Sequence, residues 1–198
     1  MWDAYAAVSS EGANLVVKIC DLSKFANEDT SSHYDMTRSE ARQSIANEAR
    51  IIQLQDKLRD QPLQGDVTPV CYGLWGSVQG DRSEIWICVV EDGGHAIETI
   101  MVDDRRIKQV YSLAEGRRLI DRNRIIALYK RIHAAGFVHN DVELRHIIWK
   151  GDLQSIKIID FDESQTRDNG MNDDMWESWC RDEIQQVAQL LERAASHV

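Results

Sequence analysis

The side chains most able to do chemistry gather in one short stretch, GFVHNDVELRHIIW at positions 136–149. Asp141 and His146 both precede an apolar run that begins at Ile147 and is typical of a buried strand. A second carboxylate, Asp160, follows the apolar run IKII. Two carboxylates at one end of a short hairpin repel each other until a cation or a proton relieves the repulsion. Because magnesium prefers carboxylate oxygens and keeps phosphates as further ligands, the pattern predicts a site for a metal-bound polyphosphate.

Two other charged residues occupy positions that periodicity predicts to be buried. Lys18 lies within LVVKIC, a strand pattern that is apolar on both faces. Glu48 follows Ile45 by three residues and precedes Ile52 by four, so it shares the apolar stripe of a helix. A buried charge needs an opposite charge, and we expect Lys18 and Glu48 to pair. The alternatives are a lysine that reaches solvent at a sheet edge and a glutamate on a solvated helix face.

Hydrophobic periodicity and turn residues predict the elements that must position these groups. A capping-box pattern at Thr37 and Glu40 marks the start of one helix, and Gly136 marks the end of another. The expected strands lie within 3–20, 71–94 and 146–160, and the expected helices run over 37–59, over 112–135 and from about 172–174 onward. This order predicts an α+β protein of two lobes, 1–93 and 94–198.

Composition and charge exclude several classes of function. The chain has 198 residues, is 43% hydrophobic and carries a formal net charge of −10. It has enough apolar residues for a core and no basic excess for nucleic acid or an anionic membrane. The four cysteines are far apart and form no C-x-x-C pair, which indicates a reducing compartment. Without an apolar run of bilayer length or a signal-peptide pattern, we expect a cytoplasmic or nuclear protein.

Together these pieces resemble the protein-kinase-like superfamily over residues 3–195. Lys18, Glu48, the IHAAGFVHND entry to a catalytic loop and the IIDFD segment follow one another in kinase order. The resemblance implies a truncated two-lobed kinase-like fold, with a small antiparallel sheet and one helix in the first lobe and a minimal, mostly helical second lobe. The HND form of the loop, with Glu143 in place of a lysine, is similar to choline and aminoglycoside kinases. The short chain resembles compact atypical kinases of the RIO and Bud types and fungal kinase-like proteins.

The resemblance also implies catalytic roles. Lys18, paired with Glu48, would hold the α- and β-phosphates of ATP. Asp141 would accept or orient the proton of the attacking hydroxyl, and Asp160 would bind magnesium, or manganese in its place.

Further roles concern the nucleotide base and the joint between the lobes. Backbone groups around Glu91 and Gly93 would face adenine. Ile52, His139 and Phe161 would stack as part of a spine that joins the lobes.

Three departures from the kinase pattern stand out. His146 occupies the place of the asparagine that holds a second metal; its imidazole suits zinc or manganese better than magnesium, or it hydrogen-bonds the loop backbone. Asp162 replaces the glycine of the aspartate-phenylalanine-glycine motif and could offer another metal-facing carboxylate. No glycine-rich turn precedes LVVKIC, so we expect weaker nucleotide binding and slower transfer.

We therefore expect a degenerate kinase-like domain, a pseudokinase that binds a nucleotide or a protein with weak or no phosphotransfer. The alternative is an active atypical ATP-dependent phosphotransferase that acts on a hydroxyl of a small molecule or a protein. ATP and magnesium are the expected cofactors of the active enzyme, whereas a pseudokinase could dispense with both. The expected partners are a protein or a small-molecule hydroxyl substrate, not nucleic acid or a membrane. An α+β domain unrelated to kinases, in which Lys18 does not face Glu48, is the third interpretation.

Overall fold

The structure is a computed structural model, and the ranges that it describes cover most of the chain. They are 2–26, 36–57, 62–78, 84–97, 122–151, 153–167 and 171–196. The first part of the helix predicted over 112–135 lies outside the described residues.

The first lobe is built on a four-stranded antiparallel sheet in the order β1-β2-β4-β3. Its strands are β1 (Asp3–Val8), β2 (Asn14–Asp21), β3 (Cys71–Val78) and β4 (Glu84–Glu91). Lys18 lies on β2, which has a neighbour on each side: Ala4 of β1 and Cys88 of β4 are its register partners. Lys18 is therefore inside the sheet, which rules out the interpretation of a lysine at a sheet edge.

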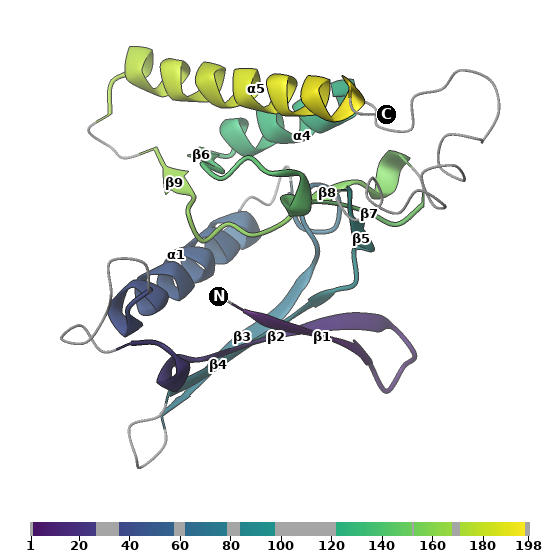
Figure 1. Cartoon of the computed structure of the whole chain (residues 1–198), viewed down its shortest axis with the longest axis vertical. Coiled ribbons are helices and arrows are strands. Elements are labelled where there is room, and N and C mark those ends of the chain that lie inside the picture. The colour runs from purple at the N-terminus through teal and green to yellow at the C-terminus, as the bar shows by residue number, and fades with distance from the viewer. Residues whose placement is uncertain are drawn as a thin grey trace.

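Helix α1 (Arg38–Lys57) packs over one face of this sheet (Figure 1). The predicted capping box forms at its start, because the Glu40 N–H donates to Thr37 Oγ1 at 3.2 Å and the Thr37 N–H donates to Glu40 Oε2 at 2.7 Å. Ala41 and Ile45 of the helix pack with Cys20 and Leu22 in a small core cluster. The helix begins one residue and ends two residues inside the predicted range.

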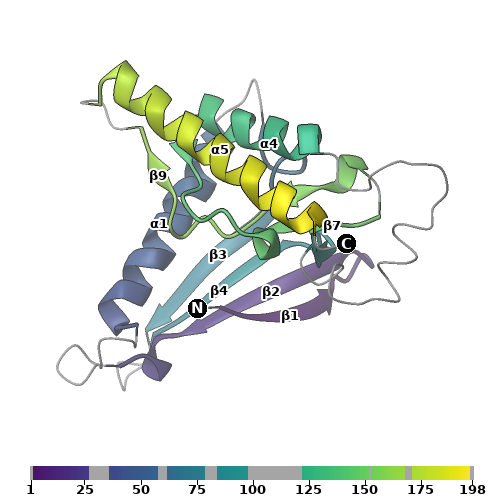
Figure 2. The same cartoon turned by 45° about the horizontal axis from the view of Figure 1, so that its top comes forward.

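The second lobe holds two long helices, α4 (Arg122–Ala134) and α5 (Asp173–Ser196), which lie side by side in Figures 1 and 2. Short strands run between these helices and the first lobe. They are β5 (His95–Ala96), β6 (Phe137–Val138), β7 (Ile147–Trp149), β8 (Lys157–Ile158) and β9 (Gln165–Thr166). The predicted hairpin is present as β7 and β8, with Ile147 opposite Ile158. One-turn 3₁₀ helices span Leu22–Lys24, Leu144–His146 and Leu153–Ser155.

The main hydrophobic core joins the two lobes. Ile51 of α1 and Val67 pack into the same cluster as Leu128 and Tyr129 of α4 and Val187 of α5. The Ile158 N–H also donates to the Val67 carbonyl at 2.8 Å, so backbone pairing continues across the joint. The predicted α+β fold of two-lobed kinase-like form is confirmed, while the proposed division at residues 93 and 94 stays a prediction.

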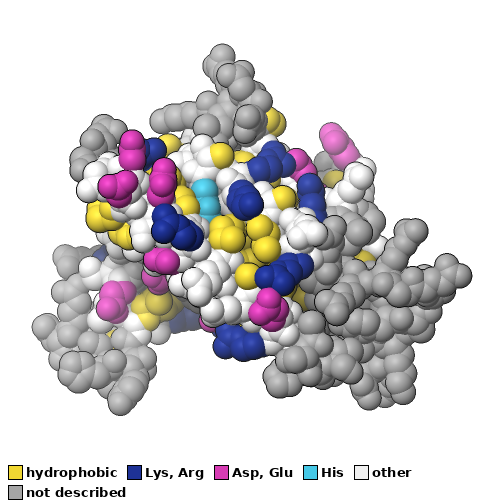
Figure 3. Space-filling view, turned by 90° about the horizontal axis from the view of Figure 1, so that it is seen from above, with side chains coloured by type: hydrophobic (Ala, Val, Ile, Leu, Met, Phe, Trp, Pro, Cys, Tyr) yellow, Lys and Arg dark blue, Asp and Glu magenta, His cyan; other side chains and the backbone are white. Residues whose placement is uncertain are grey.

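The helical face of the molecule carries charges of both signs. Figure 3 shows lysine and arginine side chains interspersed with acidic ones over this surface. None of the described helices is long and apolar enough to cross a membrane.

Candidate functional site

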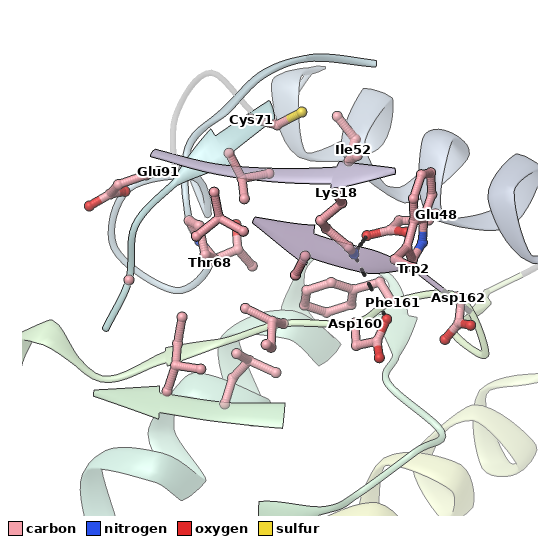
Figure 4. A pocket seen from close by; sticks show the side chains of 18 of the residues that line it. Trp2, Lys18, Glu48, Ile52, Thr68, Cys71, Glu91, Asp160, Phe161 and Asp162 are labelled. Atoms are coloured by element: carbon pink, nitrogen blue, oxygen red, sulfur yellow. Dashed lines mark hydrogen bonds and ion pairs between the residues drawn. The ribbon is translucent and has the colours of Figure 1, made fainter. Parts of the chain in front are cut away.

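A cavity of about 430 Å³ lies between the sheet with α1 and the segment around β8 (Figure 4). Glu91 lies toward one end of it and Asp162 toward the other. Apolar side chains supply much of the wall, with charged groups near Asp160, a composition typical of small-molecule sites. The lining includes six residues for which the sequence predicted a binding role, namely Lys18, Glu48, Glu91, Gly93, Asp160 and Asp162.

Lys18 stands between two carboxylates at the acidic end of the cavity. Its Nζ lies 2.6 Å from Glu48 Oε1 and 4.0 Å from Asp160 Oδ1. The side chains of Lys18 and Glu48 are 17% and 9% exposed, so both charges are largely removed from water. Burial alone would lower the pKa of Lys18, but the carboxylates of Glu48 and Asp160 outweigh it and raise the pKa above its ordinary value. Lys18 is therefore a charged ammonium.

Trp2 closes the cavity next to this ammonium. Lys18 Nζ lies 5.2 Å from the centre of the Trp2 ring, within the range of a cation–π contact. The indole Nε1 is buried without a hydrogen-bond partner in the described structure, as is Glu48 Oε2. The end of the cavity near Lys18 therefore contains a donor and an acceptor without partners in the described structure.

The loop that carries Asp141 is held in place by the buried side chain of His139. His139, fully buried, donates from Nε2 to the Ile159 carbonyl at 2.8 Å and accepts the Asp141 N–H on Nδ1 at 3.3 Å. Burial lowers the pKa of His139, so the ring is neutral and can play both parts. His139 thus ties the Asp141 loop to the segment that follows β8 and leads to Asp160. Its ring also packs against that of Phe161 in a tilted arrangement, with centroids 4.8 Å apart.

His146 lies between the carboxylates of Asp141 and Asp160. Its Nδ1 donates to the Asp141 carbonyl at 3.1 Å and lies 3.5 Å from Asp141 Oδ2, and its Nε2 lies 3.3 Å from Asp160 Oδ2. Nε2 also lies 2.9 Å from Arg145 Nε, a permanent donor, so two contacts compete for one nitrogen. The neutral ring accepts from Arg145, and the protonated ring donates to Asp160. Burial lowers the pKa of His146, but Asp160 and Asp141 outweigh it and raise the pKa above its usual value.

Asp160 and Asp162 place two carboxyl groups at the same end of the cavity. Burial alone would raise the pKa of Asp160, yet the hydrogen bond from His146 and the charge of Lys18 lower it to about 2. For Asp162, burial and the nearby charges of Asp160 and Glu48 raise the pKa to about 6. Asp160 also has a left-handed backbone with φ 70°, which an aspartate tolerates better than most residues.

This charge pattern fits a divalent cation. Asp160 is ionised and its side chain is one-third exposed. Burial raises the pKa of Asp162 most, the charges of Asp160 and Glu48 raise it further, and a cation would relieve this repulsion. Magnesium usually takes one or two carboxylates and completes its shell with water and phosphates. Within the described ranges, no three His, Cys, Asp or Glu side chains converge as a ready metal site. The predicted metal ligands Asp160, His146 and Asp162 stay a prediction.

The predicted adenine-facing segment lies at the other end of the cavity. The Glu91 N–H donates to the Val70 carbonyl at 2.8 Å, and its carboxylate lies 2.6 Å from Lys157 Nζ, so these Glu91 groups are already engaged. Gly93 is close to Ile148, whose Cδ1 would lie 2.2 Å from an added Cβ. Gly94, with φ 99°, lies against the Trp149 carbonyl. Because Gly93 and Gly94 have no side chains, the backbone at this edge of the cavity can approach Ile148 and the Trp149 carbonyl closely. The contact with adenine stays a prediction.

Three further residues take part in the site although sequence reasoning did not single them out. Arg145 lines the cavity, and its Nη2 lies 3.8 Å from Asp141 Oδ2. Asn47 of α1 donates to the carbonyls of Asp162 and Ser164 at 2.6 and 2.7 Å, which fixes α1 against the acidic segment. Glu183 accepts the Asn140 N–H at 2.6 Å and lies 2.7 Å from His133 Nε2. Only Arg145 left a signal in the sequence, as a cation four residues after Asp141.

Comparison with known protein families gives a match to part of the chain. A family model described as the lipopolysaccharide kinase (Kdo/WaaP) family matches residues 102–178. The chain is protein-kinase-like. No curated protein matches the chain.

The family match covers only some of the residues that line or adjoin the cavity. The matched segment contains Asp141, His146 and Asp160, so the similarity concerns the loop that carries Asp141 and the acidic segment around Asp160. Lys18 and Glu48 lie outside it, and their place in the site rests on the contact between them. An open, acidic cleft in which Lys18 does not face Glu48 would have supported an unrelated α+β domain; the two residues are in contact and the family match is to a kinase family, so that interpretation is wrong.

Proposed function

We propose that this kinase-like chain binds ATP with a divalent cation in the cavity and transfers the terminal phosphoryl group to a hydroxyl. The observation that carries the proposal is the position of Lys18, 2.6 Å from Glu48 and 4.0 Å from Asp160 at one end of the cavity. An ammonium beside an ionised carboxylate suits a polyphosphate and its metal ion. The volume of about 430 Å³ lies within the usual range for small-molecule sites.

Each end of the cavity supports a different part of the nucleotide. Apolar residues such as Val16 and Ile158 line the region near Gly93, where a base could pack. Lys18 would face the phosphates, and Asp160, with Asp162 beside it, would hold a magnesium or manganese ion. When bound, that ion supplies charge neutralisation for the phosphates. Trp2 covers the phosphate end, where it excludes water beside the Lys18 ammonium.

Asp141 and Arg145 serve the transfer itself. Asp141 orients the acceptor hydroxyl and accepts its proton. The guanidinium of Arg145 lies 3.8 Å from Asp141, and the Arg145 side chain is 55% exposed. It can therefore turn toward the phosphoryl group that is being transferred. Arg145 would supply the positive charge that is missing at position 143, where Glu143 stands in place of a lysine. Electrostatic stabilisation of this kind is a large part of phosphotransfer catalysis.

The acceptor is a hydroxyl group, and the family similarity favours a saccharide. The matching family is described by its action as a lipopolysaccharide kinase, so a sugar hydroxyl is the first acceptor class to test. A serine or threonine side chain of a protein is the second class.

A pseudokinase is the second candidate, and His146 is the observation that favours it. Its ring lies 3.3 Å from Asp160 Oδ2, and its raised pKa favours the protonated form that pairs with this carboxylate. A pairing of this kind competes with a metal ion for Asp160. In the described residues no strand pairs with the outer edge of β1, so the phosphates gain no cover from that side.

A transfer assay separates the two candidates. The chain is incubated with ATP labelled in its terminal phosphate, with magnesium or manganese, and with a saccharide or a serine-containing peptide as acceptor. An active enzyme labels one acceptor, and Asp141→Asn lowers the rate by about 10²–10⁴ because the base is lost. Arg42→Ala, which disrupts only a pair with Glu84 away from the cavity, leaves the rate unchanged. Nucleotide binding with no transfer, identical in Asp141→Asn, identifies a pseudokinase. Absence of both binding and transfer contradicts the proposal.

A further inference from the structure

Two cysteine thiols meet in the wall of the cavity. The Sγ atoms of Cys71 and Cys88 lie 3.9 Å apart, and no disulfide joins them. Cys71 is half-buried and lines the cavity, as Figure 4 shows, whereas Cys88 is only 1% exposed. Cys88 is the register partner of Lys18, so the thiols lie on the same face of the sheet as the ammonium.

The pairing of β3 with β4 is irregular next to Cys71. Cys71 lies opposite Val90 and Cys88 opposite Leu74, so the thiols meet diagonally across β3 and β4. Diagonal partners in a regular antiparallel pair have Cα atoms about 7–8 Å apart, which is too far for a disulfide without backbone movement. The register shifts between Cys71 and Gly73, and such an irregularity locally disrupts the ladder. The backbone beside Cys71 is therefore less constrained by ladder hydrogen bonds and can move to bring the two sulfur atoms within bonding distance.

We propose that Cys71 and Cys88 are an oxidation site, at which a hydroperoxide converts the two thiols into a reversible disulfide in the cavity wall. The sulfur of Cys71, as its thiolate, attacks one oxygen of hydrogen peroxide. The O–O bond breaks, Cys71 becomes a sulfenic acid, and the released hydroxide takes up a proton to form water. The sulfur of Cys88 then attacks that of Cys71, and the hydroxide that leaves takes the Cys88 proton as a second water. The two thiols lose two electrons, and one peroxide is reduced to two waters.

The order of these steps follows from access and charge. Cys71 faces the cavity and is the thiol that a small oxidant reaches first. The hydrogen bond with Cys71, together with burial, raises the pKa of Cys88 above its ordinary value, so Cys88 stays protonated and serves as the resolving thiol. The other two cysteines are internal controls: Cys20 is buried in the cluster near Leu22, and Cys180 lies on α5.

The position of the thiols couples the site to nucleotide binding, a consequence that rests on the proposed function. A nucleotide in the cavity covers Cys71 and should shield it from the oxidant. At a nucleotide concentration about ten times its dissociation constant, mass action predicts oxidation about tenfold slower, because only the unoccupied fraction reacts.

The test is peroxide treatment of the full chain, alkylation of the remaining thiols in denaturant, and peptide mapping without reduction. The expected product is one peptide pair joined through Cys71 and Cys88, which dithiothreitol separates, with Cys20 and Cys180 still alkylated. In Cys88→Ser, Cys71 should stop at the sulfenic acid, which dimedone traps. Cys180→Ser should behave as the parent chain. A disulfide that involves Cys20 or Cys180, oxidation of Cys71 beyond the sulfenic acid with no link to Cys88, or no reaction at Cys71 would each overturn the proposal.

Magnesium–ATP in the same experiment distinguishes this proposal from the proposed function. If ATP stabilises the chain against heat and oxidation of Cys71 is not slowed, the placement of Cys71 in the nucleotide site is wrong and the coupling fails. If ATP does not bind, the proposed function fails, and the mapping of the disulfide still decides whether Cys71 and Cys88 form the oxidation site.

Discussion

The Nζ atom of Lys18 lies 2.6 Å from Oε1 of Glu48, in a pair that joins the centre of the sheet to helix α1. Each member is buried enough that losing its partner leaves a charge with little water around it. The pair therefore holds the helix against the sheet and also presents an ammonium to the cavity.

Removal of one member of this pair should cost more stability than removal of both. We expect Lys18→Met to lower the free energy of unfolding by about 3–5 kcal/mol, because Glu48 becomes an uncompensated buried carboxylate. Lys18→Met with Glu48→Leu should recover much of that loss. Urea unfolding of the parent, both single variants and the double variant gives the coupling energy. Additive effects of the two substitutions would show that the pair is not coupled in solution.

Asn47 should be required for the position of α1. Asn47→Ala removes two donors, to the carbonyls of Asp162 and Ser164, and we expect a loss of about 1–3 kcal/mol in the free energy of unfolding. The control is Arg50→Ala, which removes only the donor to Asn47 Oδ1 on the exposed side of the helix. Equal effects of the two substitutions would mean that the contact of Asn47 with the acidic segment does not stabilise the helix.

Glu183 should make stability depend on pH in the acid range. Burial alone would raise the pKa of Glu183, but His133 and the Asn140 N–H outweigh it and lower the pKa. A carboxyl whose pKa is lower in the folded state stabilises the fold above its unfolded pKa of about 4.3, and this stabilisation is lost as pH falls through the folded value.

The measurement is the free energy of unfolding of the parent and of Glu183→Gln as a function of pH. The parent should be the more stable chain near about pH 6, and the difference should shrink as pH falls below about 4. Glu192→Gln, which removes an exposed carboxylate of the same helix, is the matched control. A difference between parent and Glu183→Gln that stays constant with pH would contradict the assignment.

Periodicity was sufficient to predict the Lys18 and Glu48 contact, because each charge stood in phase with apolar neighbours of its own element. The capping-box pattern likewise predicted the cap between Thr37 and Glu40, which are three residues apart in the chain. Local patterns of this kind are physical constraints on a single element, and the structure retains them.

The contacts between distant segments could not be predicted in this way. Asn47 reaches the Asp162 carbonyl across 115 residues of sequence, and Glu183 reaches the Asn140 N–H across 43. A backbone carbonyl or N–H has no side-chain identity, so no residue type in the sequence marks it as a partner. The diagonal approach of Cys71 and Cys88 depends on a register shift, which alternation of apolar residues does not reveal.

The most direct test of the kinase-like site is a thermal unfolding titration with ATP, in magnesium, in manganese and in chelator. At about a hundredfold excess over the dissociation constant, mass action predicts roughly 2.7 kcal/mol of stabilisation. We expect a metal-dependent shift that Lys18→Ala and Asp160→Ala abolish and that Arg42→Ala, remote from the cavity, retains. No shift in the parent with either metal, or a shift that persists unchanged in both Lys18→Ala and Asp160→Ala, would contradict a nucleotide site at this cavity.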